Sequence, residues 1–270
     1  MIRELWIQAE DESPLRIQIV EGDGGKSAIL LHGLGETSEA WLGVGRYLSR
    51  QGFTVILPDL RGHGGSRSSR RQVGLEVLAR DLKTAIEELG LSEFHAIGFS
   101  LGGYVILQSV DSWHLQDLGL ESAVIISAAH KVSDPEGMSR RASLAREGRI
   151  AELAREIASN VYKGVGDARA RLFVSRLFER VEPKAYAAIA SSLARRDFSR
   201  PWKILTEGTP TTIVLGRRDP LMGRETLPEL LDITGSRGRV LLVGTGHMIH
   251  IESPKLVREI LTCHLSHTGS

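Results

Sequence analysis

The chain has 270 residues, of which 41% are hydrophobic and 25% are charged. This composition is typical of a globular protein with one large domain, or with one domain that carries an insertion. The net charge of +1 gives no reason to expect nucleic-acid binding, and no apolar run is long enough to span a membrane. The single cysteine excludes an intrachain disulfide, and the cytoplasm is the expected location.

Strand-like and helix-like segments alternate through the first half of the chain. Runs such as 28–31 and 54–57 are apolar throughout, which is typical of strands covered on both faces. The expected strands, after a strand-like N-terminus, are 15–20, 27–31, 53–57, 94–99 and 121–127. The expected helices between them are 42–51, 73–89 and 101–110. This alternation predicts an α/β protein with a mostly parallel central β-sheet flanked by helices.

The pattern changes in the segment 131–203. Only helical signals occur from 139 to 196, where glycines and one proline separate about three or four helices. This segment holds 16 Lys and Arg against 9 Asp and Glu, so its net charge is +7 while the rest of the chain carries −6. Strand signals return at 211–215 and 239–243, each followed by a helix, at 223–232 and 255–264. We therefore predict a core domain, residues 1–130 and 204–270, interrupted by a helical insertion at 131–203.

A serine lies between the strand expected at 94–99 and the helix that follows it. The sequence Gly98-Phe99-Ser100-Leu101-Gly102 matches the pattern G-x-S-x-G, in which the serine occupies a sharp, strained turn. Small residues are needed there because neighbouring backbone comes close, and the start of the helix adds a positive electrostatic potential. We predict that Ser100 is a nucleophile. A purely structural turn is the alternative.

A serine hydroxyl needs a base, and the base needs an acid that orients it. His247 follows the last expected strand on a glycine-rich loop, and Asp219 follows the strand before it. Both side chains should therefore lie at adjacent strand ends. The chain order Ser100, Asp219, His247 is the order expected when the nucleophile follows a strand in this way. His250 is the alternative base, and Asp134 is the alternative acid.

Two hydrogen-bond donors are needed for the negative charge that develops on a substrate carbonyl oxygen. One predicted donor is the backbone N–H of Leu101, directly after the serine. The other is the N–H of Leu34 in the loop His32-Gly33-Leu34-Gly35, whose glycines let the backbone approach a substrate closely. We expect His32 to hold this loop by hydrogen bonds rather than to act as a second base.

Together these motifs resemble those of α/β-hydrolase fold proteins with a helical cap, in particular the carboxylesterase-like serine hydrolases. The resemblance extends from about residue 27 to residue 264. It includes the His32 loop with Trp41, the stretch 58–66 (Pro-Asp-Leu-Arg-Gly-His-Gly-Gly-Ser), the Ser100 motif, Asp219, and Gly246-His247. It implies that Asp59 and His63 belong to the scaffold. Ser100 disfavours the family's dehalogenases and epoxide hydrolases, which have an aspartate at this position.

The resemblance implies that carboxylic esters are cleaved through an acyl-enzyme, without a metal or organic cofactor. Trp41, Gly33 and Phe99 are candidate substrate-binding residues. The alternatives within the fold are carbon–carbon bond hydrolases, lactonases and perhydrolase-like enzymes, and, as a separate class, ligand receptors with little turnover. The expected partner is a small-molecule ester, and the basic insertion adds an acidic substrate or an acidic carrier protein as an alternative. Neither nucleic acid nor a membrane is an expected partner.

Overall fold

The computed structural model of the chain describes residues 1–68, 73–161, 168–223 and 225–267. Within them, eight strands form one sheet in the order β1-β2-β4-β3-β5-β6-β7-β8. The strands are β1 Ile2–Gln8, β2 Pro14–Val20, β3 Lys26–Leu31, β4 Phe53–Pro58, β5 Phe94–Phe99, β6 Leu120–Ile126, β7 Thr211–Gly216 and β8 Gly238–Val243. Strand β2 is antiparallel to β1 and β4, whereas β4, β3, β5, β6, β7 and β8 pair in parallel. The α/β class predicted from the sequence is confirmed.

The central strands are buried on both faces. Every residue of β5 and of β7 is buried, and Ile29, Leu30 and Leu31 of β3 are at most 1% exposed. Continuous apolar runs are favourable in this position because each strand packs helices on both sides. The outer strands β1 and β8 are more exposed: Ile7 is the one buried residue of β1, and β8 has none.

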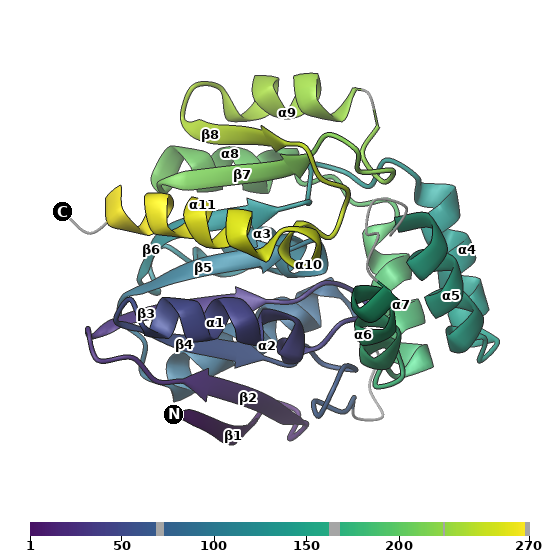
Figure 1. Ribbon diagram of the computed structural model, residues 1–270, viewed down its shortest axis with the longest axis horizontal. Coiled ribbons are helices and arrows are strands. Elements are labelled where there is room, and N and C mark those ends of the chain that lie inside the picture. The colour runs from purple at the N-terminus through teal and green to yellow at the C-terminus, as the bar shows by residue number, and fades with distance from the viewer. Residues whose placement is uncertain (69–72, 162–167, 224, 268–270) are drawn as a thin grey trace.

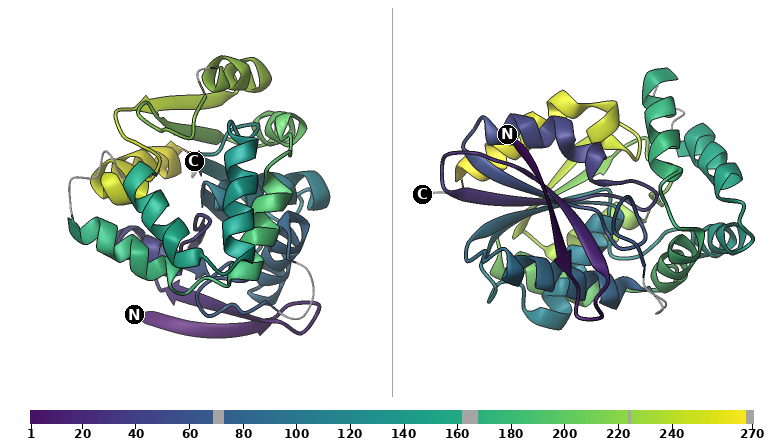
Figure 2. Two further views of the ribbon diagram at one scale, coloured as in Figure 1. Left: turned by 90° about the vertical axis from the view of Figure 1, so that its right-hand side faces the viewer. Right: turned by 90° about the horizontal axis from the view of Figure 1, so that it is seen from below.

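Helices cover both faces of the sheet (Figures 1 and 2). On one face lie α1 (Leu42–Ser49) and α11 (Pro254–His267). On the other face lie α2 (Leu75–Glu88), α3 (Leu101–Trp113) and α8 (Ser199–Gly208), with α9 (Thr226–Thr234) packed beside α8 near the β8 edge. Two short elements, η1 (Ser38–Trp41) and α10 (Ile249–Glu252), follow β3 and β8. No helix in the described parts of the chain is long and apolar enough to cross a bilayer.

A further group of helices lies beyond one end of the sheet, at the right of Figure 1 and facing the viewer in the left view of Figure 2. It consists of α4 (Pro135–Arg146), α5 (Ile150–Val161), α6 (Ala168–Phe178) and α7 (Pro183–Leu193). These helices follow β6, whose carboxyl end, like that of the other parallel strands, is directed toward them. The segment predicted as an insertion contains all four.

Helix α8 was not identified from the sequence, and the predicted boundary at residue 203 falls inside it. The helix is short, and Pro201 in its first turn resembles a break signal although proline is tolerated there. Trp202 and Leu205 are fully buried and belong to the same apolar core as α3. This packing, rather than local sequence preference, defines the helix.

Candidate active site

Ser100 occupies the corner between β5 and α3 in a strained conformation. Its backbone angles are φ 48° and ψ −109°, which a residue with a side chain rarely adopts. A Cβ atom on Gly98 would lie 2.5 Å from the backbone nitrogen of Gly103, and one on Gly102 would lie 2.3 Å from the carbonyl oxygen of Leu31. The small residues of the motif are therefore required by close backbone packing. The turn holds the serine at the carboxyl end of the sheet.

The three residues predicted for catalysis lie together. His247 Nε2 is 3.2 Å from Ser100 Oγ, and His247 Nδ1 is 2.7 Å from Asp219 Oδ2. Ser100 follows β5, Asp219 follows β7 and His247 follows β8. All three therefore lie at the carboxyl end of the sheet. This is a nucleophile, a base and an orienting acid joined by hydrogen bonds.

The alternative base and acid lie elsewhere. His250 is fully buried between Trp41 and Phe99, with ring centroids 4.7 and 4.2 Å away. Asp134 caps the start of α4, where its side chain accepts a hydrogen bond of 2.9 Å from the N–H of Gly137. Neither residue makes a hydrogen bond with Ser100 or His247 within the described residues.

The acid and the base are each held by a further hydrogen bond. The second carboxylate oxygen of Asp219 accepts a bond of 2.8 Å from the N–H of Leu221. The hydroxyl of Ser127, at the end of β6, donates a bond of 2.7 Å to the carbonyl oxygen of His247. Ser127 also has a positive φ of 53°. Sequence reasoning missed Ser127, whose only signal is a serine directly after a buried strand at the edge where the site forms.

In the loop that contains Leu34, one backbone N–H is free among the described residues, and the N–H groups on either side of it donate hydrogen bonds. The N–H of Gly33 donates to Glu36 Oε2 at 2.9 Å, and the N–H of Gly35 donates to His63 Nε2 at 3.2 Å. The N–H of Leu34 has no acceptor among the described residues. Leu101 is the first residue of α3, so its N–H has no acceptor within the helix. The two N–H groups predicted as oxyanion donors are therefore both available.

Two buried histidines hold this loop. His32 Nδ1 donates to the carbonyl oxygen of Gly33 at 2.9 Å, and its Nε2 accepts from the N–H of Leu60 at 2.9 Å. His63 Nδ1 is 3.2 Å from the carbonyl oxygen of Arg61, while Nε2 accepts from Gly35. Burial lowers the pKa of His32, and it lowers that of His63 to about 3 with a further contribution from His32. Both rings are therefore neutral and act as scaffold, as the sequence predicted.

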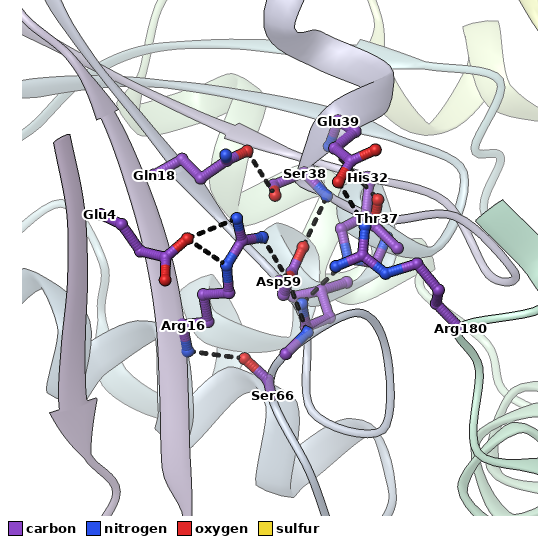
Figure 3. Close-up of polar contacts among 12 residues, drawn as sticks. Glu4, Arg16, Gln18, His32, Thr37, Ser38, Glu39, Asp59, Ser66 and Arg180 are labelled. Atoms are coloured by element: carbon purple, nitrogen blue, oxygen red, sulfur yellow. Dashed lines mark hydrogen bonds and ion pairs between the residues drawn. The ribbon is translucent and has the colours of Figure 1, made fainter. Parts of the chain in front are cut away.

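Asp59 anchors a second part of the scaffold, shown in Figure 3. Its carboxylate accepts hydrogen bonds from the N–H of Ser38 at 2.8 Å, the N–H of Gly65 at 2.8 Å and Arg16 Nη1 at 3.0 Å. The 58–66 loop is thereby fixed to β2 and to η1. Figure 3 also shows Arg180, directly after α6, paired with Glu39 of η1.

A carboxylate and an imidazole lie close together, both fully buried, behind the oxyanion loop. Glu36 Oε1 is 3.2 Å from His250 Nε2, and the other oxygen of Glu36 accepts the Gly33 bond described above. Burial alone would raise the pKa of Glu36, but the neighbouring His250 and the hydrogen bonds lower it. Because His250 follows His247 closely, this pair joins the oxyanion loop to the histidine loop. Trp41 is completely buried against His250 and lies outside both cavities described next, so the structure does not bring it to the site.

Two cavities meet at Ser100. We call them the Thr226 cavity and the Arg141 cavity. Both are lined by Ser100, His247, Met138 and Leu221. The Thr226 cavity continues along Tyr104, Ser127, Lys131, Ser133 and Thr226. The Arg141 cavity continues along Leu34, Phe99, Arg141, Phe178 and Tyr186.

Of the three predicted substrate-binding residues, Phe99 lines a cavity, Gly33 lies in the oxyanion loop, and Trp41 is buried behind the site. Phe99 lines the Arg141 cavity and contacts His247, with ring centroids 5.1 Å apart. Gly33 lies in the oxyanion loop, where a Cβ atom would meet the Phe99 ring at 2.6 Å. Across the described parts of the chain, no group of three or more His, Cys, Asp and Glu residues is arranged to hold a metal ion.

Comparison with known proteins identifies the family. A model of the Alpha/beta hydrolase family matches residues 28–260, and the chain belongs to this family. An uncharacterized protein from Mycobacterium tuberculosis is 32% identical over 120 residues, which cover 44% of this chain and 34% of that protein. The chain thus spans about a third of the length of this curated relative.

Two solved structures show the same fold over nearly the whole chain. A thermophilic esterase from Thermogutta terrifontis is 21% identical with a TM-score of 0.85, covering 99% of this chain and 100% of the esterase. The enol-lactonase from Burkholderia xenovorans is 19% identical with a TM-score of 0.86, covering 97% of this chain and 100% of the lactonase.

Proposed function

We propose that this protein is a serine hydrolase that cleaves carboxylic esters through an acyl-enzyme. The observation that carries the proposal is the hydrogen-bonded series Ser100, His247 and Asp219, placed on a strained corner where two cavities meet. A ligand receptor has no need for all three groups in this geometry. Family membership and the likeness to an esterase and an enol-lactonase support hydrolysis as the reaction class.

The reaction has two halves. Ser100 Oγ bonds to the ester carbonyl carbon while His247 Nε2 takes the hydroxyl proton, and Asp219 stabilises the imidazolium. The carbonyl oxygen becomes negatively charged and accepts hydrogen bonds from the N–H groups of Leu34 and Leu101. When the carbon–oxygen bond breaks, His247 gives its proton to the departing alcohol. Water then repeats the sequence on the acyl-enzyme, releasing the acid and restoring Ser100.

The two cavities suit an ester, which extends on both sides of its reacting carbon. One part of the substrate occupies the Thr226 cavity and the other occupies the Arg141 cavity. Helices α4 to α7 act as a cap in this proposal, because Met138, Arg141, Phe178 and Tyr186 contribute to the walls. Their side chains set the size of the acyl and alcohol groups that fit. The small-molecule ester is therefore the proposed partner.

A series of 4-nitrophenyl esters from acetate to laurate tests this function. We expect turnover in the wild type and a loss of kcat by at least about a thousandfold in Ser100→Ala, because the covalent step is removed. The acyl chain length that gives the highest turnover indicates the length of acyl group that the cavity accepts. Equal turnover in both proteins would show that Ser100 is not the nucleophile. Absence of turnover in both would reject simple ester hydrolysis in favour of lactone or carbon–carbon bond substrates.

A further inference from the structure

One arginine of the helical group lines a cavity at the nucleophile and has no partner among the described residues. Arg141, on α4, lines the same cavity as Ser100 and His247. Its Nε atom is buried and has no hydrogen-bond acceptor, and no carboxylate in the described parts of the chain lies within ion-pair distance of its guanidinium. A buried donor on a charged group is unfavourable unless something satisfies it.

Neighbouring arginines differ in this respect. Arg140 pairs with Glu156, Arg180 with Glu39, and Arg196 with Glu76. These pairs link helices to each other or to the core. Arg141 is directed into the cavity instead, so its missing acceptor is best supplied by whatever binds there.

Tyr186 adds a second polar group to the same wall. It is buried, and its hydroxyl has no hydrogen-bond partner among the described residues. Burial raises the pKa of Tyr186, and the charge of Arg141, which lines the same cavity, partly offsets this increase. The charge of Glu156 also reaches Tyr186, but Glu156 is already paired with Arg140.

A guanidinium beside a neutral hydroxyl is suited to a carboxylate, which accepts charge-assisted hydrogen bonds from both. The rest of this cavity is largely apolar, with Leu34, Ile157, Phe178 and Met248 in its walls. A ligand that matches both features has an apolar chain that ends in an anion. Its other end lies at Ser100.

We propose that the preferred substrates are esters that carry a carboxylate on their acyl or alcohol part, and that Arg141 and Tyr186 bind this carboxylate. The inference rests on the proposed ester hydrolysis and specifies its substrate class. Arg141 is then a specificity residue. Its contact with the carboxylate is made before the covalent step, so its removal acts mainly on KM.

The experiment compares anionic and neutral substrates of nearly equal shape. Mono-4-nitrophenyl adipate carries a carboxylate on its acyl part, and 4-acetoxybutyrate carries one on its alcohol part. Each is paired with the corresponding primary amide, which is neutral. The readout is the ratio of kcat/KM for the anion to that for the amide, measured in wild type, Arg141→Gln, Arg141→Lys and Arg146→Gln.

We expect a wild-type ratio above one for at least one pair, and a fall of about tenfold or more in Arg141→Gln because a charge-assisted bond is lost. Arg141→Lys should restore part of the ratio. Arg146→Gln, which removes the same charge from an exposed position at the end of α4, should leave the ratio unchanged, because Arg146 lines neither cavity and bonds the hydroxyl of Ser191 instead. Equal ratios in wild type and Arg141→Gln for both pairs, or an equal fall in Arg146→Gln, would overturn the inference.

Binding separates this inference from the proposed function. Calorimetry with monomethyl adipate and 4-acetoxybutyrate on Ser100→Ala needs no turnover. Binding of at least one compound that weakens about tenfold or more when Arg141→Gln is added would support the carboxylate site even if no ester is cleaved. Equal or absent binding in both proteins would reject it. The unfolding temperature of Arg141→Gln should stay the same or rise, whereas a structural role for Arg141 would lower it.

Discussion

Two serines at the carboxyl edge of the sheet have positive φ, which residues with a side chain rarely adopt. Ser100 follows β5 with φ 48°, and Ser127 follows the neighbouring β6 with φ 53°. Such conformations are unfavourable by about 1–3 kcal/mol each and persist only where the surroundings enforce them. One serine contacts the ring of His247 and the other holds its backbone carbonyl. The two strained residues are therefore the two serines that contact His247, the proposed base.

Ser127→Ala should reduce kcat by about tenfold and change KM little. The substitution removes a buried hydrogen bond, worth about 1 kcal/mol, whose effect is to fix the His247 loop. Ser122→Ala is the matched control, because Ser122 lies on the same strand and its hydroxyl pairs with His95 at the amino end of the sheet, away from the site. Kinetics on the best ester of the series would measure both. An equal fall of kcat in Ser122→Ala would indicate a general loss of stability instead.

The residues predicted from the sequence are those whose role can be recognised from the residues next to them in the chain. Ser100 has its glycines beside it, and His247 and Asp219 each follow a recognisable strand. Ser127 and Arg141 were missed because their importance depends on partners or cavities formed by distant segments. Trp41, which the motif predicts as a substrate contact, lies behind the site against His250.

At the scale of elements, α3 and β3 approach each other closely at Gly102, where backbone meets backbone. A methyl group on Gly102 would meet the carbonyl oxygen of Leu31 at 2.3 Å, and backbone cannot move aside as a flexible side chain can. The apolar runs that form β3, β4 and β5 were readily predicted because a strand covered on both faces has a distinctive composition. Helix α8 was not, because its burial against α3 depends on chain folding that no local pattern records.

Gly102→Ala should lower the free energy of unfolding by about 2 kcal/mol or more, since α3 must separate from β3 to admit the methyl group. Gly43→Ala should leave it unchanged or raise it by up to about 1 kcal/mol. Gly43 is exposed in α1, and the only atom near an added Cβ is the end of the Arg258 side chain at 3.7 Å. Urea unfolding of the two variants measures the difference. Equal stability would show that α3 and β3 are less tightly packed than the structure indicates.

At the scale of the molecule, the uneven distribution of charge along the sequence leads to ion pairs between the helical segment and the rest of the chain. The segment 131–203 carries +7 and the rest carries −6. Arg180, Arg196 and Arg200 of this segment pair with Glu39, Glu76 and Asp111 outside it. Exposed pairs of this kind each contribute little to stability, but together they favour one orientation of the helical group over the sheet. Much of the basic surplus is thus balanced internally.

Three buried histidines make the whole fold sensitive to acid. Burial lowers the pKa of His63 to about 3, and it lowers the pKa values of His95 and His264 to about 4. In the unfolded chain a histidine titrates near about 6.5. Below that pH the unfolded chain therefore binds protons that the folded protein does not, and the free energy of unfolding falls as pH falls. For His95 and His264 the loss is complete once the pH is below about 4, and for His63 it continues to about 3.

His264→Gln should remove one histidine's share of this dependence. Between about pH 7 and about pH 5 the free energy of unfolding of the wild type should fall by about 2 kcal/mol more than that of the variant. Thr212 Oγ1, 2.9 Å from His264 Nδ1, can still pair with the glutamine side chain. Because the two proteins have the same carboxylates, the difference between their pH dependences isolates His264. Identical curves for His264→Gln and wild type would mean that His264 is protonated as readily in the folded protein as in the unfolded chain.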